Sequence, residues 1–249
     1  MPSSQVQFSV LSHAAWAPGL VTQSDWQKWA AAPFELSGNE DAPVGAMAPM
    51  LRRRAGFLGK MALEAAYQCL GEHCGIPTVF CSRHGDVGRA LALLNNVVDQ
   101  ETMSPTNFGL AVHNASAGLF SIARGDQASH VAISAGQSTV EHGVIEACAL
   151  LDQGADRVLL VAYDQCLPSY YRPYLDCIEQ PHAWAWLIAP VAGAQQTLTL
   201  AWSASAFGAA QDDTHQMPSS LQVWQFYLNQ SGEYLHQDGR RQWRWSRHG

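Results

Sequence analysis

The sequence predicts a mixed α/β fold in which helices cover both faces of one sheet. Strand-like and helix-like segments alternate through the first half of the chain. Residues 158–162 then form an uninterrupted apolar run, which is typical of a strand covered on both faces. Two strand-like segments, 183–188 and 197–202, follow one another without a helix between them, so we expect strands that pair directly at this end.

The first elements are short. Residues 6–11 alternate apolar and polar side chains, as a strand does. Thr22 or Ser24 can cap a short helix over residues 25–29, and the Gly-, Pro- and Ala-rich stretch 33–49 predicts a loop. The other elements expected before residue 158 are a buried helix over 55–70, a strand over 78–82, a helix over 87–98, a helix that begins at Ser104-Pro105, a strand over 130–133 and a helix that follows Gln137 and ends at Gly154.

The C-terminal part is less regular. We expect one domain over residues 1–210 and a C-terminal extension over 211–249, which holds a helix over 221–228 and an edge strand. The final strand-like segment carries two tryptophans and four arginines: Trp243, Trp245, Arg240, Arg241, Arg244 and Arg247. We interpret it as a solvated or partner-facing edge strand, in preference to a site for an anionic carrier.

Composition excludes several classes of function. With 249 residues, 47% hydrophobic and 14% charged, the chain can bury a sizeable core or share apolar surface with a partner. A net charge of −7 argues against nonspecific nucleic-acid binding. The N-terminus lacks a basic start followed by an apolar block, and no apolar run is long enough to span a bilayer. We therefore expect a cytoplasmic protein without membrane or nucleic-acid contacts.

No metal or cofactor is predicted. The cysteines form no CxxC pair and match no zinc spacing, so we expect buried, reduced thiols at Cys69, Cys74, Cys81, Cys148, Cys166 and Cys177. Gly85 and Gly88 lie between a strand and a helix, as in a phosphate-binding loop. The third glycine, the lysine and the ribose-binding acid of such loops are missing, so nucleotide binding is not expected.

The turn at residues 134–137 is the most informative stretch. A buried strand, a tight turn and a helix N-terminus place one side chain in the positive potential of the helix, where a cysteine would become a nucleophile. Here that side chain is Gln137, which has no ionisable group, so nucleophilic catalysis at this point is excluded. The Gly-x-Ser-x-Gly spacing of a hydrolase also fails, because Val140 takes its last place.

Residues 134–147 (SAGQSTVEHGVIEA), followed by LLDQGADRVLLVAYD, resemble the nucleophile region of the β-ketoacyl synthases of the thiolase superfamily. In that family a Ser-Thr-Ala-Cys turn opens a helix that ends in Glu-Ala. Counting back from Glu146-Ala147 puts the family's cysteine at Gln137. Residues 104–125 (SPTNFGLAVHNASAGLFSIARG) resemble the preceding segment, which in this family contributes to the dimer interface and the substrate tunnel. The resemblance covers about the first 190 residues and implies a thiolase-like half-fold.

Two departures from that family bear on function. Ketosynthases also use two histidines and a lysine from a second thiolase half, and this chain corresponds to one half. The histidines outside the resemblance or near its end match no such motif: His182, His215, His236 and His248. Glutamine in place of the cysteine is similar to the chain length factors of type II polyketide synthases, the inactive partners of ketosynthases. The single-half form most resembles the subunit of aryl polyene pathways.

The resemblance implies a non-catalytic subunit that pairs with a complete ketosynthase, meets acyl carrier protein through the complex and shapes the acyl tunnel in polyketide (aryl polyene) or fatty-acid-like biosynthesis. Residues 126–134 are expected to pair across the interface, and the helix from Ser104 to reach the partner's tunnel. Candidate tunnel or interface residues are Thr106, Phe108, Val112, His113, Asn114, Phe120, Val131, Ile133 and Ser134.

Three other interpretations are weighed against this one. A general-base role for His113 is less favoured than a hydrogen-bonded interface or core position, because no nucleophile is identifiable near it. A malonyl-carrier-protein decarboxylase that uses Gln137 stays open as an alternative, as does a scaffold that only binds carrier protein or another enzyme.

Overall fold

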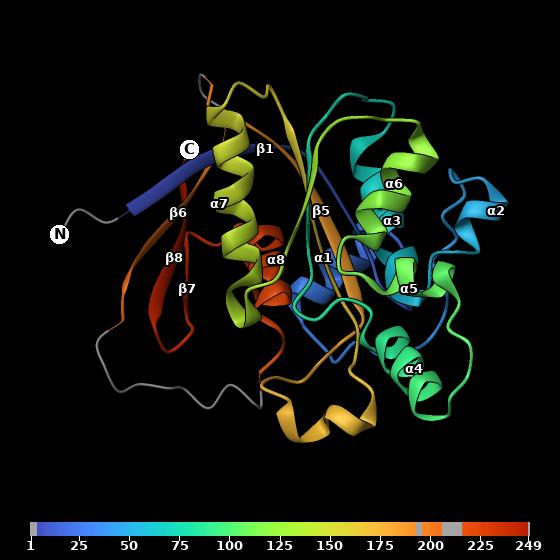
Figure 1. Cartoon of the computed structure of the whole chain (residues 1–249). Coiled ribbons are helices and arrows are strands. Elements are labelled where there is room, and N and C mark those ends of the chain that lie inside the picture. The colour runs from blue at the N-terminus through green and yellow to red at the C-terminus, as the bar shows by residue number, and fades with distance from the viewer. Residues whose placement is uncertain (1–3, 193–195, 206–215, 249) are drawn as a thin grey trace.

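One mixed sheet runs through the molecule (Figure 1). The computed structural model describes residues 4–192, 196–205 and 216–248. Within them the sheet has eight strands in the order β3-β2-β4-β5-β1-β6-β8-β7. β2 is parallel to β3 and β4, and the other neighbours are antiparallel. The strands are β1 (Ser4–Trp16), β2 (Thr78–Cys81), β3 (His130–Ile133), β4 (Val158–Asp164), β5 (His182–Ala189), β6 (Thr197–Ala204), β7 (Glu233–Gln237) and β8 (Arg241–His248).

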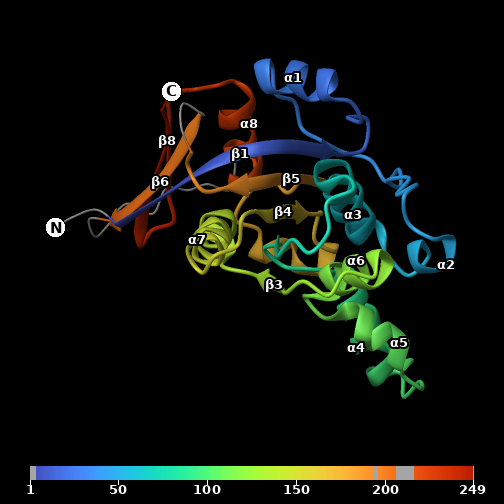
Figure 2. The same ribbon diagram turned by 90° about the horizontal axis from the view of Figure 1, so that it is seen from above.

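Helices cover both faces of this sheet, so the predicted mixed α/β architecture is confirmed. α7, α8 and α1 lie against one face, and α3 and α6 against the other (Figure 2). The helices are α1 (Gln23–Ala31), α2 (Pro49–Arg52), α3 (Phe57–Leu70), α4 (Val87–Val98), α5 (Pro105–Ala111), α6 (Ala115–Arg124), α7 (Thr139–Asp152) and α8 (Ser219–Leu228). Two short 3₁₀ segments, Gly136–Ser138 and Ser169–Tyr174, join the set. No described helix is both long and apolar enough to cross a membrane.

Local signals account for most of the element ends. Thr22 caps α1 by accepting the Asp25 backbone N–H at 3.2 Å, and the Asp25 carboxylate accepts the Thr22 N–H in return. Gly154, with φ of +103°, follows the end of α7 as predicted. β1 is longer than the expected 6–11, because it pairs with β5 along one part and with β6 along the other.

The helix expected from Ser104 is two helices, which corrects the sequence-based assignment. α5 ends at Ala111, and Val112 is extended, with ψ of 151°. His113 and Asn114 therefore lie in a short link and not on a helix. The His113 ring donates from Nε2 to the Ile133 carbonyl at 3.2 Å, a tertiary contact that helps to hold the link against the end of β3.

The final strand is internal, so its assignment as a solvated edge strand was wrong. β8 lies between β6 and β7, and β7 is the edge. Trp243 and Trp245 are fully buried, while Arg244, between them, faces the other side and pairs with Glu233 at 3.3 Å. The predicted helix over 221–228 is confirmed by α8.

Two further sequence-based expectations concern the whole chain. The proposed domain boundary at residue 210 lies outside the described residues, and the division stays a prediction. All six cysteines are free thiols. The expectation of buried thiols is confirmed for Cys69, Cys81, Cys148 and Cys177 and is wrong for Cys74 and Cys166, which are exposed.

The close approach of α7 to β2 generates a stability prediction at Gly143. A Cβ atom there would overlap Cys81 Sγ and lie 3.2 Å from Leu160 Cδ1. We expect Gly143→Ala to lower the free energy of unfolding by about 2 kcal/mol, because overpacking a rigid core outweighs the better helix propensity of alanine. Urea unfolding followed by circular dichroism measures the change.

Two companion variants separate this clash from an effect of alanine in a helix. Gly118→Ala in α6 meets no atom within 4 Å, so it should be neutral or stabilise by up to about 1 kcal/mol. Adding Cys81→Ala should relieve part of the Gly143→Ala penalty. Equal penalties at Gly143 and Gly118 would show that the contact with Cys81 is not the cause.

Candidate functional site

Gln137 lies where the sequence predicted it, in the tight turn between β3 and α7. Gly136 has φ of +59°, a left-handed conformation that glycine adopts without strain. The Thr139 hydroxyl donates to the Gly136 carbonyl at 2.7 Å and accepts the Ala135 N–H at 2.9 Å. Ser134 Oγ donates to the Arg83 carbonyl at 2.6 Å. These bonds hold the turn in one shape at the start of α7, with the Gln137 side chain half-buried.

A buried ionic cluster lies beside the turn. The Arg83 guanidinium is almost fully buried, pairs with Asp176 and donates from Nη1 to Cys177 Sγ at 2.8 Å. Asp164 accepts the Arg83 backbone N–H at 2.9 Å and the Ser82 hydroxyl at 3.0 Å. Burial nevertheless raises the pKa of the Asp164 carboxyl to about 7. Gln137 is tied to this cluster, because its Nε2 donates to the Asp176 carbonyl at 3.3 Å.

The C-terminal segment forms the opposite wall of the site. Ser219, at the start of α8, donates its hydroxyl to the Gln137 carbonyl. The Asp238 carboxylate accepts the Ser138 hydroxyl and, at 3.1 Å, the Trp243 indole N–H. Its other oxygen accepts the backbone N–H groups of Arg240 and Arg241, at 3.0 and 2.7 Å. The turn between β7 and β8 is thereby fastened to the first residues of α7.

A second buried link joins the same two segments. Glu141 of α7 has no exposed surface, and its Oε1 accepts His236 Nδ1–H at 2.9 Å and the Trp245 indole N–H at 3.3 Å. His236 belongs to β7 and Trp245 to β8. These two donors compensate part of the cost of burying the carboxylate, whose other oxygen, Oε2, has no hydrogen-bond partner among the described residues. The contact ties the hairpin to the helix.

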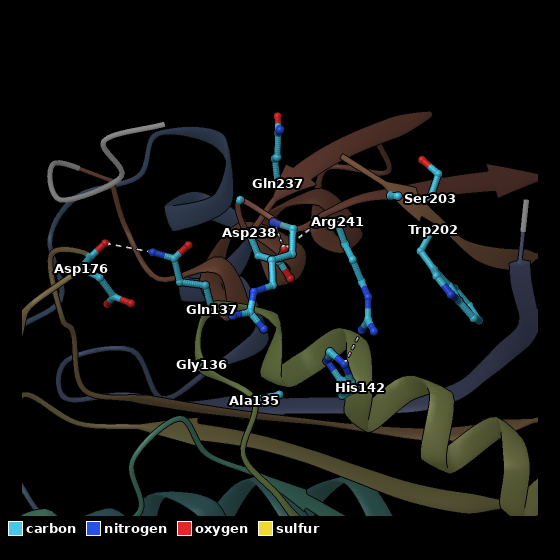
Figure 3. Close-up of a pocket in the computed structure, with 13 residues that line it drawn as sticks. Ala135, Gly136, Gln137, His142, Asp176, Trp202, Ser203, Gln237, Asp238 and Arg241 are labelled. Atoms are coloured by element: carbon cyan, nitrogen blue, oxygen red, sulfur yellow. Dashed lines mark hydrogen bonds between the residues drawn. The ribbon is translucent and has the colours of Figure 1, made fainter. Parts of the chain in front are cut away.

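Between these walls lies an open groove of about 790 Å³ (Figure 3). It is lined by the turn before α7, by the end of β6 and by the β7–β8 turn. The lining residues are Ala135, Gly136, Gln137, His142, Asp176, Trp202, Ser203, Ala204, Gln237, Asp238, Gly239, Arg240 and Arg241. Figure 3 shows Arg241 directed at the His142 ring, whose Nε2 accepts the Arg241 Nη1–H at 2.9 Å.

The groove supplies hydrogen bonds and charge, with no nucleophile among its described residues. Cys177 is the cysteine beside Gln137, and burial raises the pKa of its thiol to about 12, so it stays protonated near neutral pH. Both ring nitrogens of His142 already have partners, because Nε2 accepts from Arg241 at 2.9 Å and Nδ1–H donates to the Ser138 carbonyl at 2.8 Å. Burial lowers the pKa of His182 to about 4, and His182 lies in the core against Ser220.

The predicted site residues divide between two places, and none except Gln137 lines the groove. Val131 and Ile133 are half-buried on β3, and Ser134 follows them. Thr106, Phe108, Val112 and Asn114 are exposed on or beside α5, and His113 is half-buried next to them. Phe120 faces the core, where it packs against Tyr67 and Phe80, and so adds nothing to the exposed surface.

Sequence reasoning did not bring together the groove's other wall: Trp202, Gln237, Asp238, Arg240 and Arg241. It named Arg240 and Arg241 only as part of the final segment, where a site for an anionic carrier was the less favoured interpretation. One signal was available. Asp238-Gly239 between two strand-like segments is a strong hairpin motif, and Gly239 has φ of +78°. The partners of that hairpin lie about a hundred residues earlier in the chain, a distance at which local patterns carry no information.

Comparisons with known proteins found one family model and several solved structures that are similar to this chain. The family model described as "Beta-ketoacyl synthase, N-terminal domain" matches residues 26–246. A chain from the solved complex of the ketosynthase ApeO with its chain length factor ApeC, from Xenorhabdus doucetiae, is 27% identical. That match has a TM-score of 0.83 and covers 97% of this chain and 99% of that one. No curated protein sequence matches significantly.

More distant structures share the fold alone. A chain of the ishigamide ketosynthase/chain length factor is 12% identical, with a TM-score of 0.64, over 80% of this chain and 68% of that one. A chain of the AntDE:AntF complex, described as a type II polyketide synthase acyl-carrier protein with its ketosynthase, is 10% identical. It has a TM-score of 0.68 and covers 98% and 99% of the two chains. The resemblance inferred from residues 134–147 is confirmed, but its expected limit near residue 190 was wrong, because the family model matches as far as residue 246.

The Asp238 contacts predict a pH-dependent stability. Partial burial by itself raises the pKa of this carboxyl, but the hydrogen bonds from Ser138, Trp243 and the backbone hold the pKa at about 2, below the ordinary 3.8. Because the folded-state pKa is depressed, the stabilisation is fully present above about pH 4 and is lost as the pH falls through 2. Asp238→Asn should therefore cost about 2 kcal/mol at pH 7.

Urea unfolding of the wild type and Asp238→Asn at a series of pH values tests this. The difference between the two proteins should shrink between pH 4 and pH 2. Glu233→Gln is the matched control on the same hairpin, because its pair with Arg244 is exposed and should contribute about 0.5 kcal/mol or less. A difference for Asp238→Asn that does not change with pH would contradict the role of the carboxylate charge.

Proposed function

We propose that this chain, which belongs to the β-ketoacyl synthase N-terminal-domain family, is a non-catalytic, chain-length-factor-like subunit. In this proposal it pairs with a complete ketosynthase, meets acyl carrier protein through that complex and shapes the acyl tunnel in polyketide (aryl polyene) or fatty-acid-like biosynthesis. The observation that carries the proposal is the edge strand β3, which pairs with β2 on one side and with no described strand on the other, beside an exposed apolar surface.

The open side of β3 supports pairing with another strand. Thr78 N–H donates to the Ser129 carbonyl at 3.0 Å, and Ser82 N–H to the Ile133 carbonyl at 3.2 Å. Because bonding alternates along a strand, the backbone groups of His130 and Ala132 point away from β2. In the described residues no strand takes them up. An exposed edge of this kind is a template for a further strand, which suits residues 126–134 as the pairing segment.

The apolar surface continues from that edge. α6 packs against β3, α5 contacts α6, and α4 contacts α5. In Figure 2, α4 and α5 extend beyond the β3 side of the molecule. The exposed large apolar side chains on these helices and their links are Leu94, Val97, Val98, Met103, Phe108, Val112 and Ile122. Such a concentration marks an interaction surface, and we call these seven residues the apolar face.

The candidate site supports the absence of catalysis. Gln137 occupies the position of the family's cysteine and cannot form a thioester, and the thiol beside it is protonated. The similar ApeO–ApeC structure is a complex of a ketosynthase with a chain length factor, which supports an assembly of the same kind here. Phe108 is 58% exposed on the apolar face, so it is available to close a partner's tunnel, whereas Phe120 is not.

The interface generates the first functional prediction. Val98→Asp should abolish co-purification with the complete ketosynthase after co-expression. Val98 is 78% exposed on the apolar face, and burying an unpaired carboxylate there costs about 3 kcal/mol or more, a loss of at least about 100-fold in affinity. Affinity purification of one tagged subunit, with the other measured on a gel, gives the result.

Val21→Asp is the matched control. Val21 is 52% exposed just before α1, on the side of the molecule away from α4 and α5 (Figure 2). It should leave co-purification intact. If the ketosynthase is soluble without this chain and makes products of the same length, the proposal fails whatever the variants show.

The tunnel role generates the second prediction. Phe108→Ala should lengthen the product made by the complex, because a smaller side chain leaves room in the tunnel for a longer acyl chain. The yield of the complex should stay unchanged. Phe34→Ala is the control, since Phe34 is 59% exposed in the loop after α1. Mass spectrometry of extracted products measures chain length. A scaffold without a tunnel role predicts no shift for either variant.

A further inference from the structure

We propose that the groove beside Gln137 binds an anionic group, a carboxylate or a phosphate ester, through Arg240 and Arg241. The proposal goes beyond pairing with a ketosynthase and does not depend on it. One wall of the groove is the turn that follows β3, and the other is the β7–β8 hairpin, whose strands lie at the opposite end of the strand order from β3.

Hydrogen bonds hold the backbone of both arginines in place. The Asp238 carboxylate accepts the two backbone N–H groups of Arg240 and Arg241. The Arg241 guanidinium stacks over the Trp243 ring, 5.7 Å from its centroid, and uses one N–H on His142. A guanidinium has five N–H donors, so Arg241 keeps donors for a ligand while its plane is held in place.

Arg240 is the more available of the two. Its side chain is exposed at the groove and makes no hydrogen bond or ion pair with the parts of the chain that the structure describes. The two remaining arginines of β8 bond to residues outside the groove. Arg244 pairs with Glu233 at 3.3 Å, and Arg247 donates to the Tyr227 carbonyl at 2.7 Å.

Two aspartates and two arginines are the charged residues in the described lining of the groove, and both aspartates already have partners. Asp176 pairs with Arg83, which also lies 4.0 Å from Glu179. Each oxygen of Asp238 already accepts two donors, and its single charge offsets only one of the two arginines. Because the whole chain carries −7, a cationic rim here is a local feature that draws anions to one place.

The chemistry of the lining defines the class of ligand. A planar guanidinium fork matches the two oxygens of a carboxylate or phosphate. The Gln137 and Gln237 amides and the Ser203 hydroxyl can bond a polar body, and about 790 Å³ accommodates a small organic molecule. Gln137 has no ionisable group, and both ring nitrogens of His142 already have partners, so we expect the bound group to be held without being transformed.

Isothermal titration calorimetry on the full chain tests the proposal, with the complex used where it co-purifies. The probes are inorganic phosphate, malonate and uncharged malonamide. We expect at least one anion to bind and malonamide not to bind. Arg240→Gln and Arg241→Gln should each weaken binding at least tenfold, and Arg244→Gln, on the same strand, should change it less than twofold. Tighter binding of phosphate would identify a phosphate ester, and tighter binding of malonate a carboxylate.

Several results would overturn the proposal: no heat from either anion, equal binding of malonate and malonamide, or an equal loss in Arg244→Gln. Thermal unfolding of each variant checks the fold. Arg241→Gln could be unstable because it loses the contacts with His142 and Trp243. In that case the binding measured for Arg240→Gln tests the proposal, because the Arg240 side chain has no described hydrogen bond or ion pair to lose.

Discussion

The Asp238 carboxylate joins the last two strands of the chain to the helix that follows Gln137. It accepts donors from Ser138, Trp243 and the two arginines of the hairpin turn. Because Ser138 is the residue next to Gln137, the same contact sets the position of the hairpin and one boundary of the site. Glu141 repeats the link about one turn further along α7, through His236 and Trp245. The C-terminal segment is therefore a wall of the site, and the groove exists only when the hairpin is in place.

The turn that carries Gln137 is held in one conformation by its neighbours. Gly136 adopts the left-handed conformation that the turn needs, and the Thr139 hydroxyl bonds its carbonyl. The Arg83 carbonyl accepts the Ser134 hydroxyl on the other side of the turn. Two of the charged or titratable groups beside it already have partners: the Arg83 guanidinium pairs with Asp176, and His142 accepts from Arg241. The turn and its surroundings form a rigid frame, which suits the binding of a partner or a ligand.

The fold was predictable wherever a pattern is local. The apolar run 158–162 became a fully buried strand, and the turn that displays Gln137 could be located from its own residues. The failures involve distant partners. Val112 leaves the helix where the next residue, His113, bonds the Ile133 carbonyl, and no helical pattern contains that carbonyl. Trp243 and Arg244 alternate as an edge strand would, and only the position of β8 between β6 and β7 decides which face is buried. The groove escaped prediction for the same reason.

The two proposed binding surfaces share one short segment, which bears on whether they would influence one another. β3 leads directly into the turn at 134–138, so a strand paired with β3 would lie next to the residues that border the groove. Coupling between sites requires an element with two arrangements that both sites bias. The turn is held by the Ser134, Thr139 and Ser138 hydroxyls on three separate partners, and a second arrangement would break all three bonds together. The segment is thus better suited to act as a spacer than as a switch, and we infer that the β3 edge and the arginine-lined groove bind independently.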